Sequence, residues 1–197
     1  MLIGNIFNSR LFQTIRNGGA MLRKLLMVLP ISMVVTLLCW LIMKLIEKKC
    51  LADNKLKQLI IQRKRWILGF IFCISVLVQV GVLSRTLGSI RTIVWVPFRT
   101  PGGDNLVALY ALANLVIFIP FGILAPKVFY GINTLWKIIL VTLVTSVCIE
   151  TIQYILACGY SQVEDVIMNV AGGLIGYLII KLIEKRKNEQ NALKLKK

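Results

Sequence analysis

The chain reads NLVIFIPFGIL at 114–124, IETIQYILA at 149–157 and EDVIMN at 164–169, and these segments decide its fold. Each lies within or at the edge of a long apolar run typical of a membrane span. An ionisable side chain at the centre of such a span costs about 2.5–3.5 kcal/mol on insertion scales, so it usually faces a cavity or a partner. Five polar residues stand out on this ground: Asn114, Glu150, Gln153, Asp165 and Asn169.

The composition indicates a membrane protein with several spans. Of the 197 residues, 57% are hydrophobic, and the mean hydropathy of +0.79 exceeds that of ordinary soluble domains. The formal net charge is +16, a value often associated with nucleic-acid binding. Here the basic residues lie just outside the apolar runs, so they predict membrane topology and contacts with anionic lipids, and we expect no nucleic-acid partner.

Catalytic and metal-binding chemistry is restricted by what the sequence lacks. Histidine is absent, which excludes Ser-His-Asp and Cys-His catalysis and histidine-based metal sites. The five cysteines form no Cys-x-x-Cys pair, so they indicate neither a zinc site nor a disulfide framework. We therefore expect no metal and no cofactor.

Five apolar runs reach or approach the length of about 20 residues that a helix needs to cross the hydrocarbon core. They cover residues 25–43, 66–84, 105–126, 136–157 and 165–180. The expected fold is thus an all-α membrane protein with about five transmembrane helices. In the fifth run, Gly172 and Gly176 form a small-xxx-small pair that permits close contact with the third or fourth helix.

The distribution of basic residues sets the expected orientation. They concentrate before the second span, after the third span and in the C-terminal tail, three regions that share one side in a five-span chain. The positive-inside rule then places the C-terminus in the cytoplasm and the N-terminus outside. Four basic residues before the first span oppose this assignment: Arg10, Arg16, Arg23 and Lys24.

This layout divides the chain into three regions. Residues 1–65 would hold an N-terminal segment, the first span and a basic cytoplasmic loop, 66–183 the membrane core, and 184–197 a basic cytoplasmic tail. Apolar residues recur at helical spacing from Ile3 to Ile15. That spacing is compatible both with a short interfacial helix and with a loose basic tail.

The polar residues of three spans are expected to meet at one depth. Asn114 lies about two turns into the third span, Glu150 and Gln153 lie about one to two turns from the end of the fourth, and Asp165 and Asn169 begin the fifth. With the N-terminus outside, this depth is the outer third of the bilayer. The pattern therefore predicts an outward-facing polar pocket that binds a ligand.

A purely structural role is the alternative for these residues. The amides and Glu150 would then only tie helices together by hydrogen bonds. Because no cation lies within the spans, Glu150 would be neutral or paired with an arginine of the second loop. The arginines of that loop are Arg85, Arg91 and Arg99.

These motifs resemble those of VanZ-like membrane proteins. Residues 114–122 are similar to the family's Asn-x-x-x-Phe-x-Pro-Phe-Gly signature, residues 150–153 to its Glu-x-x-Gln, and residues 165–169, with the glycines that follow, to its Asp-x-x-x-Asn-x-x-Gly ending. The pair Pro97-Phe98 matches an upstream Pro-Phe. Order and spacing agree over roughly residues 96–177, less than half of the chain.

The resemblance implies a bacterial cell-envelope protein with a VanZ-like membrane core. The family's founding member is associated with resistance to teicoplanin, a lipoglycopeptide that binds cell-wall precursors outside the cell. The expected ligand is then teicoplanin or a lipid-linked wall precursor, bound by the five polar residues. Many relatives carry an acid where this chain has Gln162, which puts any cation or substrate binding by that acid in doubt, and Glu164 is the nearest substitute.

Other classes of function remain open from the residues alone. Glu150 and Asp165 could act as general acid and base in an intramembrane enzyme for envelope lipids, but no clear nucleophile accompanies them. Glu150 could serve a proton-coupled transporter, which would need a dimer because five spans without a repeat are few. The basic loops could instead recruit a wall enzyme. The expected partners are the lipid bilayer, with anionic lipids at the basic loops, and a second copy in an oligomer.

Overall fold

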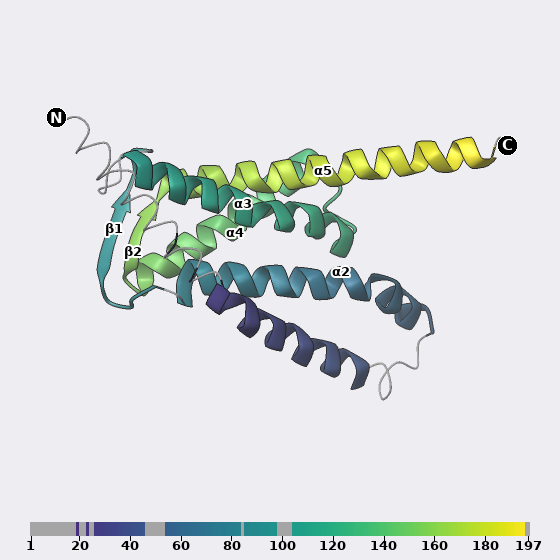
Figure 1. Cartoon of the computed structure of the whole chain (residues 1–197), viewed down its shortest axis with the longest axis horizontal. Helices are drawn as coiled ribbons and strands as arrows, with labels where there is room; N and C mark the ends of the chain where they lie inside the picture. The colour runs from purple at the N-terminus through teal and green to yellow at the C-terminus, as the bar shows by residue number, and fades with distance from the viewer. Residues whose placement is uncertain are drawn as a thin grey trace.

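The computed structural model describes Gly19, Arg23 and residues 26–45, 54–83, 85–97 and 104–195. Within these ranges five helices are long and apolar enough to cross a membrane, which confirms the expected all-α membrane fold (Figure 1). They are Leu26–Leu45, α2 (Asn54–Val78), α3 (Asp104–Val128), α4 (Leu135–Ile155) and α5 (Val163–Leu195). The segment for which an N-terminal interfacial helix was considered lies outside the described residues.

Two helices extend well beyond the apolar runs that predicted them. α2 begins at Asn54, so part of the expected basic loop is helical, and α5 continues to Leu195, far past the last apolar residue of its span. Both extensions are rich in Lys, Arg, Gln, Glu and Leu, which favour helices, and contain neither Gly nor Pro. Hydropathy marks the part of a helix that lies within the membrane, whereas helix propensity decides where the helix ends.

Glycines allow α5 to pack directly against the backbone of α3, its most extensive partner. A methyl group at Gly172 would overlap the carbonyl oxygen of Leu115, and one at Gly176 would overlap that of Ile119. From the α3 side, a methyl group at Gly122 would overlap the carbonyl oxygen of Gly173. The small-xxx-small pair thus brings α5 against α3, and close backbone approach is its physical role.

A parallel two-stranded ribbon closes one end of the bundle, and the sequence did not reveal it (Figure 1). β1 (Ile90–Val94) pairs with β2 (Cys158–Gln162) in the register Ile90 to Cys158. α4 stops before β2 because Ala157 adopts a left-handed conformation, with φ of 51°. The ribbon therefore joins the chain after α2 to the short connection between α4 and α5.

A π-helical turn, η1 (Gln79–Leu83), ends the second span and anchors the first helix. Gln79 is buried, and its Nε2 donates to Ser32 Oγ at 2.8 Å and to Ser75 Oγ at 3.0 Å. The hydroxyl of Ser32 belongs to the helix Leu26–Leu45, so this hydrogen bond ties that helix to α2. π-turns are often found at functional sites, and this one borders the cavity described below.

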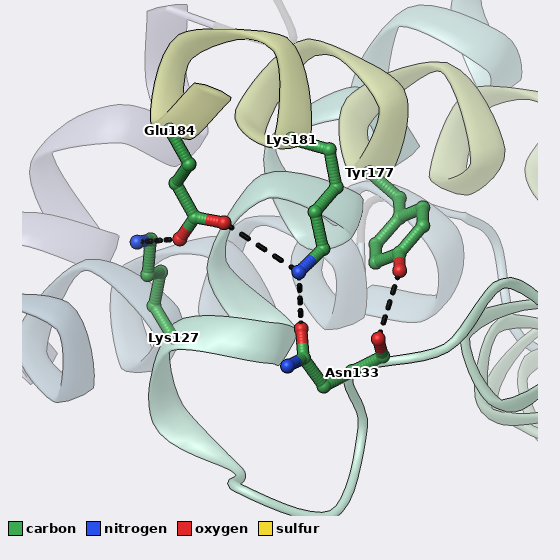
Figure 2. A network of polar contacts seen from close by, with 5 residues as sticks. All are labelled: Lys127, Asn133, Tyr177, Lys181 and Glu184. Atoms are coloured by element: carbon green, nitrogen blue, oxygen red, sulfur yellow. Dashed lines mark hydrogen bonds and ion pairs between the residues drawn. The ribbon is translucent and has the colours of Figure 1, made fainter. Parts of the chain in front are cut away.

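A mixed-charge network holds the opposite end of the bundle together (Figure 2). Lys127 at the end of α3 pairs with Glu184 of α5, and Lys181 contacts both the side-chain oxygen of Asn133 and, at 3.5 Å, Glu184. Tyr177 donates its hydroxyl to the backbone oxygen of Asn133 at 2.9 Å. The connection between α3 and α4 is thus fixed to α5 at the level where α5 leaves the bundle.

Candidate functional site

A small cavity lies just inside the ribbon end of the bundle, between the π-turn and helices α3, α4 and α5. Its volume is about 40 Å³, which is enough to hold water. All five polar residues singled out in the sequence line it, together with Arg85. The structure therefore brings the five residues to one place. That they bind a ligand stays a prediction.

Glu150 lies at the junction of α4, β2 and α5. Its side chain is buried, and its Oε2 accepts a hydrogen bond from the backbone N–H of Gln162 at 2.9 Å. Gln162 immediately precedes α5, and carboxylates are favoured at helix N-termini. Ser161 Oγ also donates to the backbone oxygen of Glu150, at 3.0 Å. Residue 162 thus contributes its backbone to the site, which any side chain at that position could do.

Gln153 connects α4 to the π-turn. Its Nε2 donates to the backbone oxygen of Gly81 at 2.8 Å. A carbonyl oxygen can only accept, so this bond fixes which end of the amide faces Gly81. The Oε1 atom of Gln153 is buried and has no hydrogen-bond partner among the residues that the structure describes.

Asp165 lies in the first turn of α5 and meets Asn114 of α3 through a side-chain hydrogen bond. Arg85 lines the same cavity and interacts electrostatically with the carboxyl groups of both Asp165 and Glu150. Its guanidinium lies against Gly159 of β2, where a methyl group would come within 3.2 Å of Nη1. The ribbon thus holds the arginine over the two acids.

Asn169 completes the cavity one turn further along α5. Its Nδ2 donates to Ser146 Oγ of α4 at 2.8 Å, while its Oδ1 is buried without a partner in the described part of the chain. The buried face of α4 consists of Ser146, Glu150 and Gln153 near the cavity. Tyr154, which the same helical spacing would admit, is 38% exposed and lies outside the cavity lining.

Several residues around the cavity carry a buried acceptor without a hydrogen-bond partner among the described residues. Across the described ranges only four buried side-chain N or O atoms have no partner, and three of them belong to cavity residues: Gln153 Oε1, Asp165 Oδ1 and Asn169 Oδ1. These residues are 2%, 5% and 4% exposed. An unmet acceptor at such depth costs about 1–3 kcal/mol. These oxygens are buried in the wall of the cavity and do not open onto the cavity itself.

Arg85 lines the cavity, and the sequence could name it only as one of three loop arginines that could pair with Glu150. It follows the second span with two other loop arginines, Arg91 and Arg99, and nothing in its local sequence distinguishes it. Arg91 instead donates to the backbone oxygen of Ile155 at 3.0 Å and is not part of the cavity lining. Within the described ranges, no group of three His, Cys, Asp or Glu side chains is placed to hold a metal ion.

A second hollow, entirely different in character, lies between the first helix and α2. It has a volume of about 460 Å³, is open to the surroundings and has an almost wholly apolar lining. Its lining includes Ile31, Val35, Phe70 and Leu83. Both hollows border the π-turn, because Gly81 lines the polar cavity and Leu83 lines the apolar one.

Comparisons with known proteins place these residues in a family context. The family model VanZ/LLP1 matches residues 66–184, more than half of the chain. The chain is also similar to "Protein VanZ" of Enterococcus faecium, with 32% identity over 125 residues that cover 64% of this chain and 74% of that relative. No solved structure matches the chain.

Proposed function

The chain belongs to the VanZ/LLP1 family, and from this premise we propose that it contributes to glycopeptide resistance, above all to teicoplanin, by binding an amphiphilic ligand at the cell envelope. The ligand is teicoplanin itself or a lipid-linked wall precursor. The observation that carries the proposal is the cavity that Asn114, Glu150, Gln153, Asp165 and Asn169 line together with Arg85.

Structural hydrogen bonding alone would not need this arrangement. Polar groups that merely join membrane helices are stabilising when they satisfy one another. Here Gln153 and Asn169 each use their amide N–H on another helix or turn and leave their oxygen unmet. Unmet acceptors in a buried site lower stability, so their presence supports a role in binding.

The size of the cavity limits how a ligand can bind. A cavity of about 40 Å³ excludes the body of a glycopeptide, so only a polar end group of the ligand would enter it. The rest of the ligand would lie along the lipid-facing helices. The apolar hollow beside the first helix, about 460 Å³, suits a hydrocarbon chain.

We further propose that the cavity lies on the outer side of the membrane, with the N-terminus outside and the C-terminus in the cytoplasm. Lys127, Lys181, Lys185 and Arg186 lie at or beyond the end of the bundle opposite the ribbon. Such an excess favours the cytoplasmic side for that end. Teicoplanin and the precursors it binds outside the cell would then be on the side of the cavity.

Susceptibility of a sensitive Gram-positive host tests the proposed function. Wild-type protein, Glu150→Gln and empty vector are compared against teicoplanin and vancomycin at matched membrane expression. The matched control is Glu189→Gln, an exposed acid on the extended part of α5. We expect protection against teicoplanin that exceeds protection against vancomycin, retained by Glu189→Gln and lost in Glu150→Gln. Absence of protection by the wild type would overturn the resistance function.

A second candidate function is an intramembrane enzyme that acts on envelope lipids. It is favoured by the interaction between the carboxyl groups of Glu150 and Asp165 within one cavity, next to Arg85. Two carboxyl groups in different surroundings can divide the roles of general acid and base. Turnover of an envelope lipid by the purified protein, stimulated by Mg²⁺ or Mn²⁺ and lost in Asp165→Asn, would support it, whereas no turnover under these conditions would exclude it.

A further inference from the structure

Going beyond the proposed function, we infer that the apolar hollow between the first helix and α2, together with a basic cluster beside it, binds one anionic phospholipid. The basic cluster consists of Trp40, Lys44 and Lys64. The lipid phosphate would lie at the two lysines, and an acyl chain would enter the hollow. Neither the cluster nor the hollow shares a residue with the lining of the polar cavity.

The basic cluster brings two lysines from different helices to one tryptophan ring. Lys44, on the first helix, has its Nζ 4.4 Å from the centre of the Trp40 ring, and Lys64, on α2, has its Nζ 6.0 Å from the same centre. The ammonium groups and the indole N–H can donate hydrogen bonds and cannot accept them. The cluster is therefore suited to an anion with several oxygens, such as a phosphate.

The charge of this region also favours an anion. Residues 44–65 carry eight Lys or Arg side chains and two acidic ones, Glu47 and Asp53, which lie outside the described residues. Lys64 takes part in a further interaction, but an ammonium group has three N–H donors and can bind a phosphate oxygen as well. A positive excess of this kind next to a membrane attracts anionic headgroups.

Contacts of α2 place the basic cluster at the level of lipid headgroups. Arg63, which precedes Lys64, donates to the backbone oxygen of Val128 at 3.0 Å, and Lys127 Nζ lies 5.5 Å from the centre of the Trp66 ring. Lys127 also belongs to the network at the end of the bundle opposite the ribbon (Figure 2). Basic and aromatic side chains gather where the hydrocarbon meets the headgroups, so a phosphate is expected at this level.

The apolar hollow begins next to the basic cluster and follows the same two helices. On α2 its lining starts at Phe70, six residues after Lys64 or about 9 Å at the helical rise, and on the first helix it includes Val35, five residues before Trp40. The glycerol backbone of a phospholipid would cover the interval. The far end of the hollow, at Leu83, belongs to the π-turn, so a ligand of the other leaflet would approach from that end.

The lining favours a hydrocarbon chain as the occupant. It contains no charged side chain, and its two polar residues bond to each other, because Gln79 Nε2 donates to Ser75 Oγ at 3.0 Å. The helix Leu26–Leu45 is the least enclosed of the five candidate spans, with 11% of it buried inside the protein. Lipid therefore has access to the space that this helix leaves beside α2.

Native mass spectrometry of the full-length protein in detergent tests the site. Phosphatidylglycerol is compared with phosphatidylcholine of identical acyl chains, because both carry a phosphate and only the first has a net negative charge. Glycerol 3-phosphate, which has the phosphate without the chains, is the third probe. The variants are Lys44→Gln/Lys64→Gln and, as a control with the same loss of charge, Lys185→Gln/Lys187→Gln on the exposed extension of α5.

We expect the wild type to bind phosphatidylglycerol about tenfold or more tightly than phosphatidylcholine and to retain no glycerol 3-phosphate. The Lys44→Gln/Lys64→Gln variant should lose about fivefold of this preference for each lysine, the factor that one basic residue near anionic lipid commonly supplies. The control variant should keep the preference.

A second pair of variants tests the hollow. Val35→Trp should fill part of it and weaken binding of phosphatidylglycerol severalfold. Val34→Trp, at an exposed position outside the lining, should leave that binding unchanged. An equal effect of the two substitutions would exclude the hollow as the chain site.

Equal binding of the two phospholipids by the wild type would overturn the inference, and that comparison needs no variant to fold. An equal loss of preference in both double-lysine variants would also overturn it, because attraction by net charge alone would then explain the binding. Protection against teicoplanin is not a readout of this experiment, so its failure would leave the proposed function intact.

Discussion

The two polar clusters of this molecule, one at each end of the bundle, differ in whether their buried polar groups find hydrogen-bond partners. At the end away from the ribbon, Lys127, Asn133, Tyr177, Lys181 and Glu184 satisfy one another (Figure 2). At the ribbon end, the cavity residues are deeply buried and retain three acceptors without partners in the described ranges. The first cluster is a structural joint, whereas the second is the candidate binding site.

This difference shows that the burial of a polar group and the hydrogen bonds it makes must be considered together. Glu184 is 36% exposed in its side chain and paired with two lysines, so water and its partners share its charge. Asp165 is 5% exposed, and one of its oxygens has no partner among the residues that the structure describes. The more costly environment is thus also the less satisfied one, which is the pattern expected of a binding site.

The largest effect should come from the helix contact that both clusters depend on. Gly172→Leu would force a side chain into the backbone of α3 at Leu115. Overpacking commonly costs about 1–3 kcal/mol, and overlap with a backbone that cannot move should cost about 3 kcal/mol or more. We expect loss of monodisperse protein by size-exclusion chromatography. Gly131→Leu, at an exposed turn with no neighbour within 4 Å, is the control and should express normally.

The sharpest contrast between the ends should come from Glu150→Gln. Glutamine can still accept from the backbone N–H of Gln162 while the charge is removed. We therefore expect the melting temperature in detergent to stay equal or rise, although protection against teicoplanin is lost. A fall of more than about 5 °C, roughly 1 kcal/mol or more for a chain of this size, would mean that Glu150 is mainly structural.

A smaller effect is expected from Tyr177→Phe at the joint. It removes a 2.9 Å hydrogen bond to the backbone oxygen of Asn133 and keeps the ring. Such bonds contribute about 1 kcal/mol. Unfolding followed by tryptophan fluorescence should show that loss, with susceptibility to teicoplanin unchanged. Altered susceptibility at wild-type stability would contradict the division of the two ends into joint and binding site.

The smallest effect should follow Glu184→Gln. Its pairs with Lys127 and Lys181 are partly exposed, and exposed ion pairs contribute about 0–1 kcal/mol. The cost should shrink further in 1 M NaCl, where salt screens charges beyond about 3 Å. Comparison of unfolding at low and high salt checks this. A large loss of unfolding free energy that does not depend on salt would show that the joint is as desolvated as the cavity.

Much of the fold followed from the apolar runs, and the five cavity residues followed from polar groups inside them. Asn114, Glu150 and Asp165 are conspicuous because a lipid-facing position would be costly. Arg85 is not conspicuous, because an arginine just outside a span is ordinary. Its role depends on the ribbon, and β2, with the sequence CGYSQ, has no alternation of apolar and polar residues that would predict a strand.

The ends of the helices also escaped prediction for physical reasons. The region from Asn54 onward and the tail of α5 are polar, so hydropathy ends where the helices continue. The unmet oxygens of Gln153 and Asn169 depend on where Gly81 and Ser146 lie in space. Spacing along one helix predicts which face of the helix a residue lies on. It does not predict which partner on another helix or turn its side-chain amide will bond to.

The length of α5 has a consequence for how a ligand arrives. Asp165 and Lys185 lie 20 residues apart on one continuous helix (Figure 1), about 30 Å at the helical rise, which equals the thickness of the hydrocarbon core. When Lys185 and its basic neighbours lie among the headgroups of one leaflet, Asp165 reaches the headgroup boundary of the other. An amphiphile in that second leaflet can therefore meet the cavity by lateral diffusion, without moving its polar group through the hydrocarbon.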